Sequence, residues 1–190
     1  MKELNLYLIP KKVEQTERAV YSVQQFSNLI GKPRTVARVY MNRLVKRGLA
    51  KNVLKGKISF LDDDFVISAQ MFEPSYISLS TALAFHELIP QISAFVECVT
   101  TRNSRKYPHL GITYHKISPK LFYGYSKLRK AWSYILIADP EKAVIDSLYF
   151  NAIDIDTVKD ILPKLNSEKI EKYIKMFKGK GAEKIKRLLL

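Results

Sequence analysis

The chain has 190 residues, of which 47% are hydrophobic, and carries 32 Lys and Arg against 18 Asp and Glu. This length accommodates one domain or two small ones, and the hydrophobic content is that of a globular protein and not of a disordered chain. No run of 18 apolar residues occurs, and the early charges of MKELNLYLIPKK argue against a signal peptide, so neither a membrane span nor export is expected. The single cysteine, Cys98, excludes an internal disulfide, and we expect a reducing, cytoplasmic setting.

The positive charge is concentrated in the first third of the chain. Residues 1–60 contain 13 basic and 3 acidic side chains, whereas residues 61–190 contain 19 and 15. Proteins that bind the phosphates of nucleic acids present such a concentrated basic surface. The alternative is a lysine-rich face that contacts only water. The helices and strands predicted in this region distinguish a nucleic-acid-binding surface from a solvated one.

Residues 21–31, YSVQQFSNLIG, have the pattern of a short helix. Ser22 and Gln25 stand at the spacing of a capping box, and Gly31 is a natural stop. A second helix is predicted over residues 34–47. Its buried stripe is expected to consist of Val36, Val39, Tyr40 and Leu44. Two short helices joined by a tight turn that contains glycine are typical of a helix-turn-helix.

The second predicted helix provides candidates for DNA contact. The residues predicted to lie off its buried stripe are Arg34, Thr35, Ala37, Arg38, Met41 and Asn42. Arg and Asn side chains bind guanine and adenine edges in the major groove, and residues near the N-terminus of such a helix usually reach the bases. We therefore expect Arg34, Thr35 and Arg38 to contact bases or phosphates. Asn42 and Arg43, further along, complete the candidate residues of this helix, and Arg43 is expected to contact the DNA backbone or only water.

The segment LAKNVLKGKISFLD predicts a β-hairpin with Lys55-Gly56 in its turn. A hairpin directly after the second helix is the winged-helix arrangement, and the whole segment resembles the winged helix-turn-helix of bacterial and archaeal transcriptional regulators. The lysines placed to meet phosphates beside the groove are Lys51, Lys55 and Lys57. A DNA-binding domain is therefore predicted over residues 1–61.

A second domain is predicted over residues 62–190. Residues 62–64, three consecutive aspartates, are interpreted as a solvated loop at the junction, because consecutive carboxylates do not converge on a metal. Within residues 74–90, Ser78 or Ser80 is expected to cap a helix in which His86 faces the core. His86-Glu87 is half of a zinc-protease motif, but Pro90 stands where the second histidine would be needed, so no metal site is expected.

The second domain is predicted to be β-rich over residues 92–138 and helical over residues 139–190, which gives an α+β fold. The predicted strands are AFVECVTTR, GITYHKIS, FYGYSKL and WSYILIA. Asp139 is expected to cap the first of several helices. The apolar stripes of the later helices, near 154–163, 167–177 and 181–190, are Ile155-Val158-Ile161-Leu162, Ile170-Tyr173-Ile174-Phe177 and Ile185-Leu188-Leu189.

No catalytic residue, cofactor or metal is expected. The sequence contains no P-loop, no G-x-G-x-x-G and no G-x-S-x-G motif. The acids and the lysine of residues 139–146 could suggest a nuclease, but a nuclease needs carboxylates that converge on a metal from separate elements. A helix cap and an i, i+4 pair of Lys142 and Asp146 explain them, so the protein is predicted not to be an enzyme.

Four blocks in order resemble a known family: PSYISLSTALAFHELIPQ, VTT, ITYHKISPKLFYGY and ADPEKAVIDSLY. They resemble the AbiEi-type antitoxin and transcriptional regulator family of type IV toxin–antitoxin and abortive-infection systems, over nearly the whole chain. The resemblance implies a repressor whose winged helix binds inverted repeats at its own promoter, with two protomers on the DNA. It also implies that the larger domain counteracts a nucleotidyltransferase-like toxin.

Other functions stay open at this level. The chain could be a solitary regulator without a toxin partner, or a protein-interaction module in which the winged helix is only a scaffold. A metal-dependent nuclease is the remaining alternative.

Overall fold

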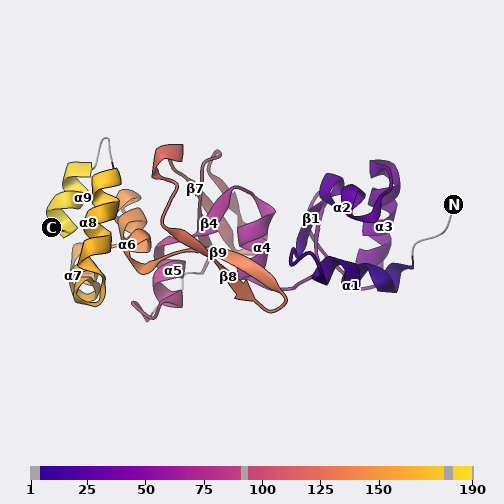
Figure 1. The fold of residues 1–190 in the computed structure, drawn as a ribbon, viewed down its shortest axis with the longest axis horizontal. Coiled ribbons are helices and arrows are strands. Elements are labelled where there is room, and N and C mark those ends of the chain that lie inside the picture. Colours follow the sequence, from indigo (N-terminus) through magenta and orange to yellow (C-terminus); the bar gives the residue numbers. More distant parts are fainter. Residues whose placement is uncertain (1–4, 91–93, 178–181, 190) are drawn as a thin grey trace. The chain divides into compact units, whose positions relative to one another are not determined.

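The computed structural model describes residues 5–90, 94–177 and 182–189 (Figure 1). Helices and strands are mixed in an α+β fold with two sheets. The chain forms two compact units. The first unit comprises Met1–Glu73 and Leu128–Ile135, and the second unit comprises Pro74–Lys127 and Leu136–Leu190.

The first unit combines short helices with a small sheet. Its elements up to Glu73 are η1 (Leu6–Leu8), α1 (Ile9–Glu14), β1 (Val20–Ser22), α2 (Val23–Ile30), α3 (Arg34–Lys46), β2 (Lys51–Leu54), β3 (Lys57–Ser59) and α4 (Asp64–Met71). The sheet is antiparallel in the order β1-β3-β2. The two helices and the hairpin predicted from residues 21–59 are therefore confirmed, and α2 and α3 lie side by side (Figure 1).

Local signals in the sequence explain where α2 begins and ends. The Ser22 hydroxyl accepts the Gln25 N–H, and the Gln25 side chain in turn accepts the Ser22 N–H at 2.9 Å, which completes the capping box. Gly31 ends the helix at φ 62°, a left-handed conformation in which glycine is unstrained. Pro33 then stands just before α3 as its N-cap residue.

The buried face of α3 differs from the predicted stripe. Ala37, Tyr40, Met41 and Leu44 are buried in one core with residues of α1 and α2, whereas Val39 is 48% exposed. The prediction was therefore wrong in burying Val39 and in leaving Ala37 and Met41 outside. Both sets have helical spacing, and the contact with α1 and α2 selects the one that starts at Ala37.

The three aspartates of residues 62–64 do not form the expected solvated loop. The Asp63 carboxylate accepts the Val66 N–H at 3.0 Å and caps α4, a helix that the sequence did not predict. Gln70 of α4 is buried and accepts the N–H groups of Ala19 and Val20 at 2.9 and 3.1 Å. Because α4 packs in this way, the first unit continues to Glu73, beyond the predicted boundary at residue 61.

Residues 128–135 are joined to the first unit by the same glutamine. The Gln70 amide nitrogen donates to the Ser133 hydroxyl and to the Tyr134 carbonyl oxygen, both at 2.9 Å. The Ser133 hydroxyl donates in turn to the Glu17 carbonyl at 2.7 Å. All hydrogen-bonding atoms of the Gln70 amide are thus satisfied inside the first unit.

The second unit contains most of a mixed sheet and the C-terminal helices. The sheet has the order β6-β7-β5-β4-β9-β8. The elements that follow Glu73 in the chain are β4 (Ser75–Ile77), α5 (Leu79–Phe85), β5 (Val96–Thr100), β6 (Arg105–Tyr107), η2 (Pro108–Leu110), β7 (Ile112–Lys116), η3 (Pro119–Leu121), β8 (Tyr125–Lys130), β9 (Ser133–Ala138), α6 (Pro140–Tyr149), α7 (Ile155–Ile161), η4 (Leu162–Lys164), α8 (Ser167–Met176) and α9 (Ala182–Leu189). The strands predicted within residues 94–138 are confirmed.

Residues 74–90 contain the predicted helix, which begins after Ser78, one of its two expected caps, but is shorter than predicted. They begin with β4, which pairs with β5 in antiparallel fashion and with β9 in parallel. Only α5 is helical, and it ends at Phe85, so His86 follows the helix and its Nε2 lies 2.8 Å from the Ala138 carbonyl oxygen. His86 is half-buried in this contact with the protein backbone.

The C-terminal helices α6, α8 and α9 pack against one another (Figure 1). Asp139 caps α6 by accepting the Lys142 N–H at 3.0 Å, as predicted. The stripe of α8 is buried as expected, but Ile155 of α7 is 48% exposed, so the predicted stripe of α7 begins only at Val158. Within the described ranges, no helix combines the length and the apolar composition needed to cross a membrane.

Candidate nucleic-acid interface

The exposed face of α3 carries polar side chains from its first turn onward. Arg34, Thr35, Arg38 and Asn42 are all exposed; Thr35, Arg38 and Asn42 point away from the buried Ala37 and Leu44, and Arg34 lies at the N-terminal end of the helix. No side chain caps α3, and no acidic residue lies in its first turn. The first N–H groups of the helix therefore face solvent together with two arginines, an arrangement that attracts anions.

A groove of about 700 Å³ runs between α3 and the β2–β3 hairpin. Its lining residues are Val23, Arg38, Met41, Asn42, Val45, Lys46, Asn52, Lys55, Gly56, Lys57 and Ile58. The lining contains four basic residues and no acidic one. The structure thus brings together four of the predicted site residues, namely Arg38, Asn42, Lys55 and Lys57.

The turn of the hairpin is held against the start of α2. Gly56 has φ +77°, and its carbonyl oxygen accepts the Val23 N–H at 3.1 Å. A residue with a side chain would be strained at this φ, so glycine is the favoured residue for the turn. Lys55 precedes it and is exposed at the tip.

The four basic side chains of the groove differ in whether they already have a partner within the protein. Among the described residues, Arg38, Lys46 and Lys55 have no hydrogen bond or ion pair with another side chain or with the backbone. In contrast, the Lys57 ammonium donates to the Met71 carbonyl oxygen. Arg38, Lys46 and Lys55 are therefore the cations that are ready to receive a ligand.

Two other predicted residues lie outside the groove lining and already have partners. Lys51 forms an ion pair with Asp62 at 2.6 Å, and this hydrogen bond raises the pKa of the exposed Lys51 ammonium. The Arg43 guanidinium lies 5.7 Å from the centre of the Tyr40 ring. Arg34 and Thr35 also lie outside this lining, in the first turn of α3.

Sequence reasoning left two polar side chains of the groove, Lys46 and Asn52, out of the candidate set. Lys46 follows Asn42 by four residues, so helical spacing could have placed it on the same face. Asn52 lies on β2, and its position opposite α3 depends on the packing of the hairpin.

The second unit contains a buried polar cluster of which the sequence predicted only one part, the i, i+4 pair of Lys142 and Asp146. Lys142 and Asp146 form an ion pair in which both side chains are 0% exposed. Asp146 also accepts hydrogen bonds from the Tyr76 hydroxyl at 2.9 Å and the Ser78 hydroxyl at 2.8 Å. Burial and the neighbouring carboxylate of Asp146 raise the pKa of Tyr76 well above its ordinary value, which keeps the phenol protonated as a donor.

A second polar cluster of this unit has the wrong connectivity for a serine nucleophile. The Ser80 hydroxyl donates to Glu97, and His115 Nε2 lies 3.5 Å from the other Glu97 carboxylate oxygen. The serine is therefore bonded to the carboxylate and not to the imidazole, whereas a general base must take the proton of the serine hydroxyl itself. In the part of the chain that the structure describes, no three His, Cys, Asp or Glu side chains are grouped to hold a metal ion.

Comparison with known proteins adds no relative to this picture. No model of a known protein family matches the chain, and no curated protein matches it. What the protein does has to be inferred from the charged groove between α3 and the β2–β3 hairpin.

Proposed function

We propose that the first unit binds double-stranded DNA as a winged helix-turn-helix. In this proposal α3 enters the major groove, and the β2–β3 hairpin lies beside it as the wing. The observation that supports it is the groove between the two, with four basic residues and no acidic residue in its lining. A surface of this sign attracts the phosphates of a DNA strand.

The candidate residues divide into base and phosphate contacts. Arg38 and Asn42 lie on the exposed face of α3, and their side chains suit guanine and adenine edges in the major groove. Arg34 and Thr35, beside the free N–H groups of the first turn, suit a phosphate or a base at the helix N-terminus. Lys46 and Lys55 suit phosphates on the strand that passes between helix and hairpin. Lys51 and Lys57 would first have to release Asp62 and the Met71 carbonyl.

The sequence resemblance extends the proposal to regulation. An AbiEi-type regulator would repress its own promoter by binding an inverted repeat with two protomers in the cytoplasm, and its second unit would counteract a nucleotidyltransferase-like toxin. Co-expression with a nucleotidyltransferase encoded beside this gene tests the second part. Growth restored by the whole chain, and equally by a variant that no longer binds DNA, supports an antitoxin function of the second unit. Unrestored growth identifies a solitary regulator.

DNA binding itself is tested by fluorescence anisotropy with the whole chain. The probes are a duplex from the region upstream of the gene and a scrambled duplex of equal length and composition, at low salt and at increasing salt. We expect tighter binding to the upstream duplex and an affinity that falls steeply with salt. The double variant Arg34→Ala, Arg38→Ala should lose the preference for the upstream duplex.

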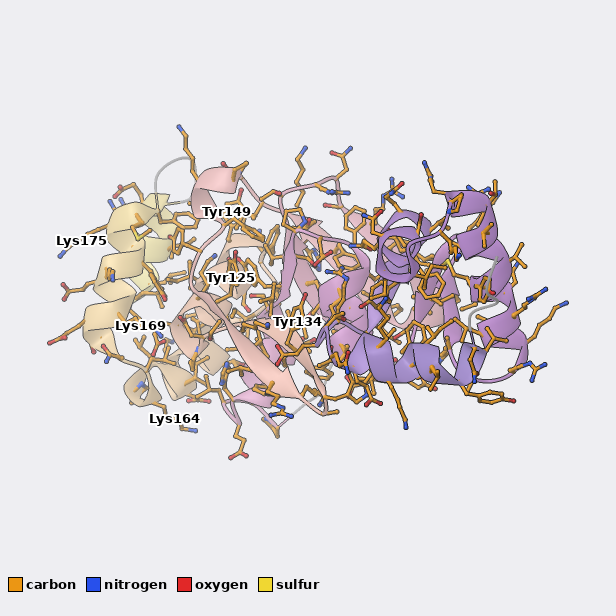
Figure 2. All side chains as sticks on the ribbon, turned by 45° about the vertical axis from the view of Figure 1, so that its right-hand side comes forward. Tyr125, Tyr134, Tyr149, Lys164, Lys169 and Lys175 are labelled. Carbon is orange, nitrogen blue, oxygen red and sulfur yellow. The ribbon has the colours of Figure 1, made fainter. Side chains whose placement is uncertain are left out.

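The matched control removes two charges elsewhere. Lys164 and Lys175, which Figure 2 labels on the C-terminal helices, belong to the second unit and are exposed. The double variant Lys164→Ala, Lys175→Ala should keep the preference. Absence of binding by the unmodified chain at low salt would overturn the proposal and favour a protein-interaction module.

A further inference from the structure

Val39 is the one large hydrophobic side chain of α3 that is exposed, at 48%. It stands in the middle of a helix all of whose residues are described, between Arg38 and the buried Tyr40. An exposed apolar side chain that is isolated needs no explanation on an ordinary surface. Its position on the proposed DNA-binding face gives it a specific meaning.

Three of the four neighbours of Val39 on the helix surface are hydrophilic, and the fourth, Val36, is half-buried and packs against the core of the first unit. Thr35 precedes it by four residues, and Asn42 and Arg43 follow it by three and four, so all three share its face. These three side chains are exposed. A protein-docking surface on this face would require several adjacent exposed apolar residues, whereas Val39 is the single exposed apolar side chain of α3, beside three exposed hydrophilic ones.

We infer that Val39 packs against the 5-methyl group of a thymine in the major groove. One base pair of the recognised sequence is therefore an A·T pair whose thymine lies on the strand that faces Val39. The inference rests on the proposed DNA binding and names the base that α3 reads beside Arg38 and Asn42. The thymine methyl is the apolar group that base edges present in the major groove. The valine methyl groups cannot form hydrogen bonds, so no other base edge would be matched by them.

The size of the effect follows from the burial of one methyl group. Removing one buried methyl is expected to weaken binding about fourfold at each half-site. A hydrogen-bonded base contact such as that of Arg38 should have a larger effect, on the order of tenfold or more. The two kinds of contact are therefore distinguishable by size as well as by position.

The test replaces thymine by deoxyuridine, which lacks only the 5-methyl group. The bound duplex is first defined by selection from a random pool and footprinting with the whole chain. Each thymine within the footprint is then replaced singly, and dissociation constants are measured for the unmodified chain and for Val39→Ala. We expect one position per half-site at which deoxyuridine weakens the unmodified chain about fourfold and leaves Val39→Ala unaffected.

Two controls separate this result from loss of folding. Val39→Ala removes an exposed side chain from a helix and introduces a better helix former, so its circular dichroism should be unchanged. Ile155→Ala removes an apolar side chain that is also 48% exposed, from α7 of the second unit, and should keep the full sensitivity to deoxyuridine.

Each remaining outcome counts against the inference in a recognisable way. A chain that binds duplexes with no sensitivity to deoxyuridine at any position retains the DNA-binding function but refutes the contact of Val39. Equal sensitivity in the unmodified chain and in Val39→Ala assigns the methyl contact to another residue. A chain that binds no duplex at all refutes the proposed function and this inference together.

Discussion

The Lys142 ammonium pairs with the Asp146 carboxylate one turn further along α6, and solvent reaches neither side chain. Asp146 also accepts the hydroxyl groups of Tyr76 and Ser78, so a single carboxylate ties α6 to β4 and to the residue before α5. Two charges taken out of water are stable only while each has its partner.

Lys142→Met should lower the free energy of unfolding by about 3–5 kcal/mol, because it leaves a buried carboxylate without its counter-charge. The double variant Lys142→Met, Asp146→Leu should lose less than the sum of the two single variants. Urea denaturation of the four proteins measures both quantities. The control is Lys175→Met, which removes the exposed i, i+4 partner of Glu171 and should change stability by less than about 0.5 kcal/mol. Equal losses in Lys142→Met and Lys175→Met would contradict the structural role of the buried pair.

Gly124→Ala should also destabilise the second unit, through the same lysine. Gly124 has φ +74°, and a Cβ added there would lie 2.9 Å from Cβ and Cγ of Lys142. Backbone strain and the clash together should lower the free energy of unfolding by about 2–4 kcal/mol. Gly48→Ala is the matched control, because Gly48 has φ +69° and open space around the added Cβ. It should lose only the backbone contribution, about 1–2 kcal/mol, and an equal loss in both variants would show that Lys142 yields to the methyl group without strain.

Glu141 should make stability depend on acidic pH. Burial raises the pKa of Glu141, but the Asn166 N–H at 3.0 Å and the Lys169 ammonium at 3.2 Å outweigh it and hold the pKa below its ordinary value of 4.5. Lys169, labelled in Figure 2, reaches this carboxylate from α8. The unfolded chain therefore binds this proton more readily than the folded chain. The contribution of Glu141 is present above about pH 4.5 and is lost as the pH falls through the lowered pKa.

The measurement compares the unmodified chain with Glu141→Gln by urea denaturation between pH 3 and 7. The stability difference between them should be largest at neutral pH and should shrink below pH 4.5, the ordinary value for this carboxyl group. A difference that stays constant over the whole range would mean that the carboxylate charge is not what the two neighbouring groups stabilise.

The hairpin lysines should separate DNA binding from stability. Lys55→Ala should reduce the slope of log affinity against log salt by about 0.9, since a free cation of the groove would lose one phosphate. Lys57→Ala should leave that slope nearly unchanged and lower stability by about 1–3 kcal/mol, because its ammonium serves the Met71 carbonyl. Anisotropy titrations at several salt concentrations and urea denaturation distinguish the two variants. The reverse result would mean that Lys57 leaves Met71 when DNA binds.

Sequence signals were sufficient where the structure is decided locally. The capping box of Ser22 and Gln25, the stop at Gly31 and the glycine of the hairpin turn depend on residues a few positions apart. They predicted α2, α3 and the hairpin with nearly correct bounds. The choice of buried face on α3 was not local, because two sets of apolar residues have helical spacing and only packing against α1 and α2 distinguishes them.

The remaining differences have the same origin. The strand β4 has only three residues, and its pairing of Ile77 with Ile137 joins positions 60 residues apart, which no local pattern reveals. Burial of Lys142 could not be predicted either, because charged residues are rarely buried and the hydroxyl groups of Tyr76 and Ser78, which also bind its partner Asp146, come from distant parts of the chain. The sequence placed Arg38, Lys51 and Lys55 in the candidate site alike. The structure separates them, because Lys51 is paired with Asp62 whereas the side chains of Arg38 and Lys55 have no partner among the described residues.

The division of the first unit has a consequence for how the protein is made. The amide of Gln70 needs the Ser133 hydroxyl and the Tyr134 carbonyl to complete its hydrogen bonds. During translation the segment that carries α3 leaves the ribosome long before residues 128–135 are synthesised. Until then the Gln70 amide nitrogen lacks both of its hydrogen-bond acceptors. The first unit therefore reaches its final structure only after much of the second unit has been translated.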